Sequence, residues 1–292
     1  MDTFVDSSWY QFRYTSPKQS SSPWEGWALE QWAPVDQYTG GAEHAVMHLL
    51  YARFFTKALR DLGLLSFGEP FKRLYNQGHI IAQNAKMSKS RGNVITPDDY
   101  VKTYGADIVR IYLMFLGPWD QGGQWSDNGI NGIARWINRV WDLVHYPPNK
   151  LARSNQNTQS IKDIQRVLHK TIKKALNDLE HFKFNTTLAS LMEFTNALQQ
   201  SWNKQNVDEK TWNNCIESLV LLLAPIAPHI TEELWEHLGK KFSIHQQSLP
   251  SWDEELARDE EITLVVQVNG KVRDKITVSA SITESDAIAL TY

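Results

Sequence analysis

Residues 86–93 read Lys86-Met87-Ser88-Lys89-Ser90-Arg91-Gly92-Asn93. Two lysines three positions apart, with hydroxyl side chains between and after them and a glycine close behind, are typical of a loop that binds phosphate. The ammonium group of lysine is compact and mobile, so it can stay with a phosphate while negative charge builds up on it. A solvated surface loop is the ordinary alternative for a segment rich in lysine, serine and glycine. The surrounding sequence decides between the two.

The composition describes a globular chain with two or three domains. Its 292 residues are 42% hydrophobic, which is enough for sizeable buried cores. The net charge of −3 gives no overall basic field, so any binding of nucleic acid has to rest on local basic patches. Cys215 is the only cysteine, which excludes internal disulfides and multi-cysteine zinc sites and favours a reducing cytosol. The most apolar stretch, 219–227, is too short to cross a bilayer, so we expect a soluble, cytoplasmic protein without a membrane partner.

The first third of the chain mixes short strands with helices. Residues 3–5 and 74–81 favour strands, whereas residues 43–62 and 97–115 favour helices. The later helix has a clear start, because Thr96 is a suitable N-cap and is followed by a proline and two acidic residues. We expect an α/β layer in which this helix begins shortly after the lysine loop.

The sequence from 130 to 238 is helical almost throughout. A weakly structured boundary segment interrupts it at 147–160, and a second one follows it at 239–253. A later helix in this region is expected to run from Thr231 to Gly239. An earlier helix carries an apolar stripe with spacings of three and four, formed by Ile161, Ile164, Leu168, Ile172, Ala175 and Leu179. Beside the stripe runs a basic face that could lie along a phosphate backbone, formed by Lys162, Arg166, Lys170, Lys173 and Lys174. The pattern indicates a helical bundle, and a solvated charged face is the ordinary alternative for the basic residues.

The apolar period changes to two after residue 260, and an Asn-Gly pair at 269–270 predicts a β-hairpin. A strict two-residue turn would set Val268 opposite Lys271 and mix the two faces. We therefore expect a three-residue loop that pairs Val268 with Val272. The polar face would then carry Lys271, Arg273 and Lys275.

A second group of candidate residues lies upstream of the lysine loop, in the run Tyr38-Thr39-Gly40-Gly41-Ala42-Glu43-His44-Ala45-Val46-Met47-His48. Glycines before a helix allow close approach of a ligand to the backbone, and the helix start offers free N–H groups. His44 and His48 share one helix face, and without an obvious third ligand they favour hydrogen bonds to a substrate or nucleotide over a metal. Two satisfied histidines in a packed helix are the alternative. Near the N-terminus, residues 6–10 group short polar side chains with aromatic ones, for which core packing is the ordinary interpretation.

Taken in order, these motifs resemble the second half of a bacterial-type leucyl-tRNA synthetase, a class I aminoacyl-tRNA synthetase. The lysine motif is shared by all class I synthetases, whereas the helix at 48–55 and the hairpin at 266–273 indicate leucine rather than isoleucine, valine or methionine. The likeness covers essentially the whole chain through Asp2-Thr3-Phe4, Ser7-Ser8-Trp9-Tyr10, 40–44, 48–55, 86–90, Tyr104-Gly105-Ala106-Asp107, 227–235 and 266–273.

The resemblance implies a multidomain α/β plus all-α fold. The second half of a Rossmann-like catalytic domain would occupy 1–118, an anticodon-binding-type helical bundle 119–240, and a small, incomplete α+β tRNA-contacting domain 241–292. The implied activity is leucine–tRNA ligation, in which ATP activates leucine to leucyl-adenylate and the leucyl group passes to tRNA(Leu). Mg²⁺ would accompany ATP, and no protein-bound metal is expected.

The same resemblance assigns roles to individual residues. Leucine would be surrounded by Ser7, Tyr10, Tyr38, His44 and His48. The adenosine end of ATP would lie near Gly40, Gly41 and Glu43. The loop Lys86-Met87-Ser88-Lys89-Ser90 would bind ATP, with Lys86 and Lys89 as catalytic residues that face the phosphates. The tRNA contacts would come from the basic helix face and from Lys271, Arg273 and Lys275.

One signature of the family is absent from this sequence, namely a His-x-Gly-His-type motif. The resemblance therefore implies a complementary N-terminal half, on a separate subunit or on a missing part of the same chain, that supplies the opposite wall of the ATP site. The isolated chain is expected to be inactive. Two alternatives stay open: a non-catalytic tRNA-binding module derived from a synthetase, and a related class I synthetase for another aliphatic amino acid.

Overall fold

The computed structural model describes residues 3–147, 158–258, 261–279 and 282–290. Contacts divide the chain into two compact units: unit 1 is Met1–Ile95 with Leu116–Ser126, and unit 2 is Thr96–Phe115 with Asp127–Tyr292. These units differ from the domain ranges expected from sequence. Thr96–Phe115 groups with the helical part, 119–126 groups with unit 1, and 241–292 is not separated from the helices; the ranges themselves stay a prediction. Most of the boundary segment predicted at 147–160 lies outside the described residues, as does Asp2.

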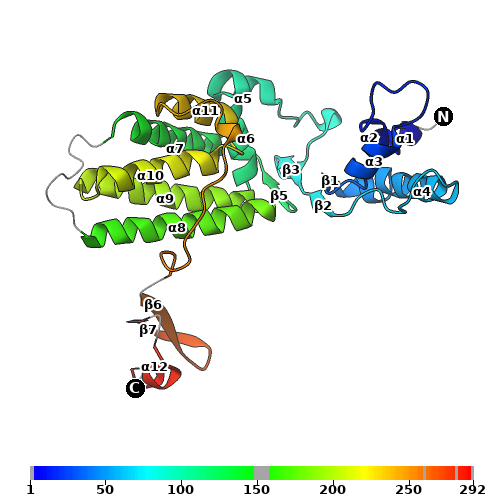
Figure 1. The fold of residues 1–292 in the computed structure, drawn as a ribbon. Coiled ribbons are helices and arrows are strands. Elements are labelled where there is room, and N and C mark those ends of the chain that lie inside the picture. The colour runs from blue at the N-terminus through cyan, green and yellow to red at the C-terminus, as the bar shows by residue number, and fades with distance from the viewer. Residues whose placement is uncertain (1–2, 148–157, 259–260, 280–281, 291–292) are drawn as a thin grey trace. The chain divides into compact units, whose positions relative to one another are not determined.

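Unit 1 contains two small sheets flanked by short helices (Figure 1). Its elements are α1 (Thr3–Asp6), α2 (Tyr10–Arg13), α3 (Gly26–Trp32), β1 (Tyr38–Gly41), the 3-10 turn η1 (Ala42–Ala45), α4 (His48–Asp61), β2 (Leu74–Gln77), β3 (His79–Ala82), β4 (Ala85–Lys86), the 3-10 turn η2 (Lys89–Arg91) and β5 (Gly122–Gln124). Strands β1 and β2 pair in parallel, and α4 connects them, as parallel neighbours require. The second sheet has the order β4-β3-β5, with β3 antiparallel to β4 and parallel to β5.

The strand predicted at 74–81 is confirmed, but it is divided between the two sheets at Gly78. A side chain at Gly78 has no room, because its Cβ would lie 2.1 Å from the backbone nitrogen of Gly122. The strand predicted at 3–5 is wrong, because these residues begin helix α1. There Phe4 stacks on Tyr51 of α4, so a tertiary contact outweighs the weak local preference for a strand.

A small aromatic and aliphatic core stabilises the N-terminal part of unit 1. Phe12, Leu29 and Leu65 are buried together. Partly buried side chains that pack against them include Trp9, Trp24, Leu59 and Phe67. Helix α4 buries a separate, narrow face formed by His48, Ala52 and Thr56. This face includes one of the predicted site residues, so a candidate functional side chain is also part of the packing.

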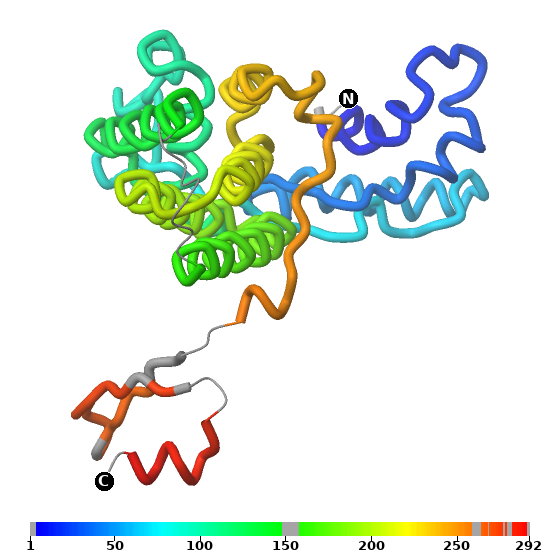
Figure 2. The backbone as a smooth tube through the Cα atoms, turned by 60° about the vertical axis from the view of Figure 1, so that its left-hand side comes forward, coloured from blue at the N-terminus to red at the C-terminus, as the bar shows by residue number. Residues whose placement is uncertain are grey.

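Unit 2 is mainly helical. Its elements are α5 (Pro97–Tyr104), α6 (Ala106–Phe115), α7 (Asp127–His145), α8 (Thr158–Glu180), α9 (Phe184–Lys204), α10 (Glu209–Leu223), α11 (Pro228–His237), the 3-10 turn η3 (Ile244–Gln246), β6 (Glu261–Val268), β7 (Lys271–Ser279) and α12 (Glu284–Ala289). Figures 1 and 2 show α7, α8, α9 and α10 side by side. The apolar stripe predicted on α8 is confirmed, since Ile164, Leu168, Ile172 and Ala175 are buried. Within the described ranges, no helix is both long enough and apolar enough to span a membrane.

The helix predicted at 97–115 is two helices, because Gly105 takes a positive φ of 88° and ends α5. Helix α11 begins at Pro228, earlier than the predicted start at Thr231. The cause is a distant residue: the carboxylate of Asp107 on α6 accepts a hydrogen bond from the backbone N–H of Ile230 at 2.7 Å. An acceptor supplied from another helix caps α11, so the local sequence was not a sufficient guide to where it begins.

The loop predicted for the C-terminal hairpin is wrong. The turn has two residues, Asn269 and Gly270, both with positive φ, and Val268 stands opposite Lys271. A β-bulge next to Val266 then adds one residue to β7, so that Leu264 and Ile276 still face each other. The two-residue turn alone would set apolar residues of β6 opposite polar residues of β7 along the whole hairpin. The bulge shifts the register by one residue, so that apolar residues face each other again beyond it.

Candidate functional site

The predicted leucine-binding residues meet around His48 in unit 1. His48 is the first residue of α4, Tyr38 is the first residue of β1, and Ser7 follows α1. The Tyr38 hydroxyl lies 2.9 Å from His48 Nδ1, and His48 Nε2 lies 2.5 Å from the carbonyl oxygen of Ser7. His48 itself is only 6% exposed. Both ring nitrogens are therefore engaged, in a setting with little access for water.

These two contacts determine which ring nitrogen of His48 carries the proton. A carbonyl oxygen can only accept, so Nε2–H donates to Ser7. In the neutral ring, Nδ1 then accepts the hydrogen bond that the Tyr38 hydroxyl donates. The ring is held in one tautomer and one orientation. With both nitrogens in use, His48 has no lone pair left for a metal.

Aromatic rings enclose His48 on several sides. The ring centroid of Tyr10 lies 5.9 Å from that of His48, and the ring centroid of Tyr38 lies 5.5 Å away. Burial raises the pKa of both phenols, and a neighbouring tyrosine raises it further, Tyr14 for Tyr10 and Tyr10 for Tyr38. Both phenols are therefore neutral hydrogen-bond donors at neutral pH. Phe71 completes the enclosure at 6.2 Å from His48, and no motif in the sequence had pointed to it.

The predicted adenosine-side residues lie at the end of β1 and in η1. Glu43 and His44 are both in η1, directly after Gly40 and Gly41 of β1. A Cβ on Gly41 would lie 2.4 Å from the Glu43 carboxylate, so any larger residue at this position would require the Glu43 side chain to move. Within the described part of the chain, the buried Nδ1 of His44 has no hydrogen-bond partner. A buried nitrogen without a partner is available to a ligand.

Glu43 links this segment to the lysine loop. The pKa of the Glu43 carboxyl is lowered from its ordinary value, mainly by hydrogen bonding from its own backbone N–H. The charges of Lys86, His79 and His44 lower the pKa further, against the opposing effect of burial. His79 Nε2 lies 3.8 Å from the Glu43 carboxylate, although the sequence had not marked His79 as a site residue. The two predicted ATP-binding segments thus lie within electrostatic reach of each other.

The lysine loop, residues 86–93, begins at the end of β4 and includes η2. Lys86 ends β4 and stands opposite Ile81 of β3, whereas Lys89 begins η2. Between them, the hydroxyls of Ser88 and Ser90 are 2.6 Å apart. Throughout the ranges that the structure describes, neither lysine forms an ion pair, so both ammonium groups are available to an anion. Met87 is half-buried in the same loop.

Several residues of the basic face predicted on α8 form ion pairs with acidic neighbours. Lys173 pairs with Glu254 at 2.7 Å, and Lys174 pairs with the buried Asp178 at 2.7 Å. Arg166 lies 3.3 Å from Asp163. Lys162 is exposed and Lys170 is half-buried. Any contact of this face with a phosphate backbone would have to compete with these ion pairs.

The basic residues predicted on the hairpin do not share one face. Lys271, Arg273 and Lys275 are all exposed. Lys271 pairs with Val268 and stands in register on the side of Leu264, whereas Lys275 pairs with Val265 and stands on the other side. The bulge that contains Arg273 causes this change of side. The expectation of a common polar face is therefore wrong.

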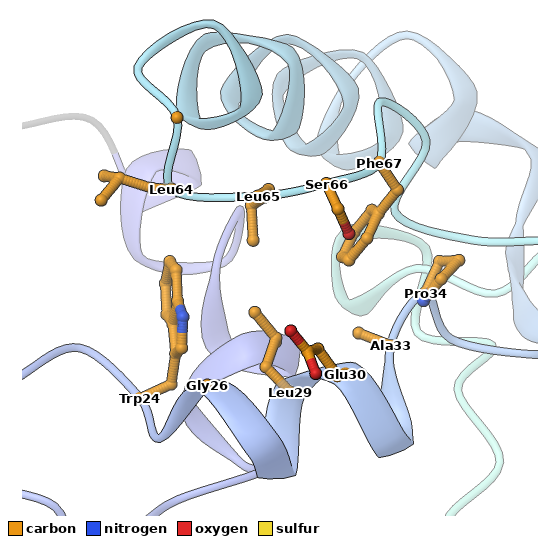
Figure 3. A pocket seen from close by; sticks show the side chains of 11 residues that line it. Trp24, Gly26, Leu29, Glu30, Ala33, Pro34, Leu64, Leu65, Ser66 and Phe67 are labelled. Carbon is orange, nitrogen blue, oxygen red and sulfur yellow. The ribbon is translucent and has the colours of Figure 1, made fainter.

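A cavity of about 440 Å³ in unit 1 lies apart from these residues (Figure 3). It is lined mainly by α3 and the segment 63–67, with Trp24, Leu29 and Phe67 around it and the Glu30 carboxylate at one side. None of the predicted site residues lines this cavity. In the described residues, no cluster of three His, Cys, Asp or Glu side chains could hold a metal ion.

Comparisons with known proteins agree with the expected resemblance. The family model described as "tRNA synthetases class I (I, L, M and V)" matches residues 1–125. The family model described as "Anticodon-binding domain of tRNA ligase" matches residues 162–288. The expected combination of a class I catalytic segment with an anticodon-binding-type helical domain is confirmed.

Relatives among characterised proteins are leucine–tRNA ligases. The one from Dehalococcoides mccartyi strain CBDB1 is 53% identical over 289 residues, which is 98% of this chain and 35% of the relative. The one from Rubrobacter xylanophilus is 51% identical over 288 residues, which is 98% of this chain and 34% of the relative. A crystal structure of the ternary complex of Agrobacterium radiobacter K84 agnB2 LeuRS with tRNA and LeuAMS has a TM-score of 0.85 at 38% identity, covering 100% of this chain and 38% of that one. The chain thus spans about a third of the length of the relatives it matches.

Proposed function

This chain belongs to the class I tRNA synthetases, and we propose that it forms the leucine- and phosphate-binding part of a leucine–tRNA ligase. The observation that carries this proposal is the arrangement around His48, in which Tyr38 and the Ser7 carbonyl hold the ring and aromatic side chains enclose it. Relatives with 46–53% identity over nearly all of this chain are leucine–tRNA ligases, which supports leucine as the amino acid.

Leucine is proposed to bind against the enclosure formed by Ser7, Tyr10, Tyr38, His44 and His48. Aromatic faces provide apolar contact for its branched side chain. The unpartnered Nδ1 of His44 is a polar atom that a bound substrate or an attendant water could satisfy. Because His48 is held in one tautomer, it presents a fixed shape rather than an adaptable one.

The proposed first step is attack of leucine on ATP. An oxygen of the leucine carboxylate forms a bond to the α-phosphorus, the bond from that phosphorus to the β-phosphate bridging oxygen breaks, and pyrophosphate leaves with the electron pair. Lys86 and Lys89 stabilise the negative charge on the phosphates, and the hydroxyls of Ser88 and Ser90 can donate hydrogen bonds to them. ATP would enter as its Mg²⁺ complex, and Gly40, Gly41 and Glu43 are proposed to lie near its adenosine end.

The proposed second step uses tRNA(Leu). The oxygen of a terminal-ribose hydroxyl forms a bond to the leucyl carbonyl carbon, the bond from that carbon to the phosphate oxygen of AMP breaks, AMP leaves with the electron pair, and the hydroxyl proton is released to solvent. The match of residues 162–288 to an anticodon-binding domain supports a tRNA contact by the helical part. Proposed contacts are Lys162, Arg166, Lys170, Lys173 and Lys174 on α8, with Lys271, Arg273 and Lys275 on the hairpin. Since three of these residues hold ion pairs with acids, their contribution should depend strongly on salt.

The activity is proposed to need a complementary N-terminal half that carries a His-x-Gly-His-type motif, because this sequence contains none. The test is leucine-dependent ATP–pyrophosphate exchange, measured for the isolated chain and for the chain mixed with the preceding segment of the Dehalococcoides mccartyi relative. We expect no exchange from the chain alone and measurable exchange from the mixture. Exchange by the isolated chain would contradict the need for a second half. We place the activity in the cytosol, in keeping with the single Cys215.

In the active mixture, Lys89→Ala should lower the exchange rate by about 10²-fold, the scale of losing one preorganised charge contact at a transition state. Lys102→Ala is the matched control, since it removes another exposed lysine from α5, outside the loop. An unchanged rate for Lys89→Ala would remove Lys89 from the mechanism. A panel of amino acids in the same assay separates leucine from other aliphatic substrates. Salt-sensitive tRNA binding without exchange in any mixture would favour a non-catalytic tRNA-binding module.

A further inference from the structure

The lysine loop ends in a buried asparagine whose side chain reaches back across the loop. Asn93 is 5% exposed. Its Oδ1 accepts a hydrogen bond from the backbone N–H of Ser88 at 2.9 Å. Its Nδ2 donates to the carbonyl oxygens of Ala82 at 3.1 Å and Lys86 at 3.3 Å. Both hydrogens of the amide nitrogen and the carbonyl oxygen of the side chain are therefore in use.

These contacts tie the first half of the loop to the sheet. Ala82 is the last residue of β3, and Lys86 already stands in the ladder opposite Ile81. The Asn93 side chain adds a bond to the Lys86 carbonyl and a bond to the Ser88 N–H, so the backbone on both sides of Met87 is held. The first lysine thus projects from a fixed backbone.

Among the residues that the structure describes, the second half of the loop has no such hydrogen bonds to the sheet. From Lys89 to Arg91 the chain forms the short turn η2, which Gly92 ends. The backbone hydrogen bonds here are local: Arg91 N–H donates to the Ser88 carbonyl and Gly92 N–H donates to the Lys89 carbonyl. Gly92 has a φ of 66°, a conformation that favours glycine and that ends the turn directly before Asn93. Lys89, Ser90, Arg91 and Gly92 are all exposed. The second lysine therefore stands on a segment that can move without breaking contacts to the sheet.

We propose that Asn93 is a positioning residue that divides the loop into an anchored half, 86–88, and a movable half, 89–92. Lys86 is held in place for the phosphates of bound ATP, whereas Lys89 is left free to follow the charge that develops as pyrophosphate departs. The role of the loop as an ATP-binding element rests on the proposed function, but the anchoring by Asn93 is a property of this chain alone.

Only an amide suits this position. Aspartate has nearly the same shape and can still accept from Ser88, but it cannot donate to the carbonyls of Ala82 and Lys86 and sets a negative charge against them. Alanine removes all three hydrogen bonds. Asn84, in the exposed turn between β3 and β4, offers a matched control for the same asparagine-to-aspartate change in the same region.

The first measurement needs no enzyme activity. Hydrogen exchange of the isolated chain should show the Ser88 amide exchanging about tenfold faster or more in Asn93→Ala, the scale of losing one buried hydrogen bond, with the β1 and β2 amides unchanged. Asn84→Ala, the same change at an exposed position, should leave Ser88 unchanged. Equal exchange at Ser88 in Asn93→Ala and the unaltered chain would overturn the anchoring. So would a general loss of protection throughout unit 1, because that would assign Asn93 to the stability of the whole unit.

The second measurement uses ATP–pyrophosphate exchange with the complementary half present. Asn93→Asp should raise the KM for ATP about tenfold and leave the KM for leucine unchanged, since a misplaced Lys86 weakens a charged contact to the phosphates. Misfolding of a fraction of the protein would lower the rate but alter neither KM. An unchanged KM for ATP in an otherwise active mixture would overturn the inference and leave the proposed function intact. Faster exchange at Ser88 without activity in any mixture, including the unaltered chain, would instead count against the proposed function.

Discussion

Replacing Asp107 by alanine is expected to destabilise unit 2 by about 2 kcal/mol. The Asp107 carboxylate accepts from the Ile230 N–H at 2.7 Å and lies 2.8 Å from His229 Nδ1, so it caps the first turn of α11. Asp107 is 7% exposed, and water has little access to replace the lost acceptor. An N-cap contributes about 0.5–2 kcal/mol and a carboxylate at the positive end of a helix about 0.3–1 kcal/mol, which together give the expected loss.

Two further variants separate the parts of this effect. Asp107→Asn keeps the shape and one acceptor but removes the charge, so it should cost about 1 kcal/mol. His229→Ala is the control, because the His229 side chain is 76% exposed and a polar contact of such an exposed group contributes below about 0.5 kcal/mol. The expected order of destabilisation is alanine at 107, asparagine at 107, and then alanine at 229.

The assay is urea unfolding followed by far-UV circular dichroism, which reports chiefly on unit 2 because the long helices lie there. The midpoint should shift while the slope of the transition stays constant. A capping role for Asp107 would be ruled out if Asp107→Ala unfolded at the same urea concentration as the unaltered chain. It would be ruled out equally if His229→Ala lost as much stability as Asp107→Ala.

The remaining predictions concern the site in unit 1 and the stability of unit 2 at acid pH. Tyr38→Phe removes the hydroxyl that donates to His48 Nδ1 and should destabilise unit 1 by about 1–2 kcal/mol, measured by urea unfolding; an unchanged midpoint would contradict this. Burial opposes ionisation of Asp178, but hydrogen bonds from Lys174 and Thr186 outweigh it and leave its pKa below the ordinary 3.8. The stabilisation from the charge of Asp178 should therefore be complete above pH 3.8 and be lost as the pH falls through the lower folded-state pKa. In Asp178→Asn, the free energy of unfolding should fall less steeply as the pH is lowered in this range. An equally steep fall in the variant would argue against this assignment.

Local patterns in the sequence predicted those parts of the fold that depend on burial along one element. The apolar stripe of α8 and the strands around Gly78 follow from spacing, because a buried face repeats with the period of its own helix or strand. The short segment at 3–5 was predicted wrongly, since so few residues cannot distinguish a helix from a strand. There the stacking of Phe4 on Tyr51 decided the conformation.

The candidate site also contains residues that the sequence predicted and residues that only the structure revealed. Motifs alone singled out Tyr38, His44 and His48, and the folded chain brings them together around one ring. Phe71 and His79 were missed because neither belongs to a motif. Phe71 is held by a bridge to Val35, shortly before β1, and His79 is held by the pairing of its own strand β3 with β5. The spacing of residues along the chain does not show which residues strand pairing brings next to each other.

Residue identity at fixed spacing was enough to indicate the family and to suggest the kind of chemistry, because the order and spacing of motifs along the chain do not depend on how the elements pack. The likeness to leucyl-tRNA synthetases and the proposal that residues 86–90 bind phosphate both came from the sequence without the structure. Three features could be found only in the folded chain: Asp107 caps a helix that begins more than a hundred residues later, a bulge sends Lys271 and Lys275 to opposite sides of the hairpin, and Asn93 divides the lysine loop. The physical reason is that hydrogen bonds of buried polar groups must be satisfied by whichever partner packing brings within reach, and that partner need not be near in sequence.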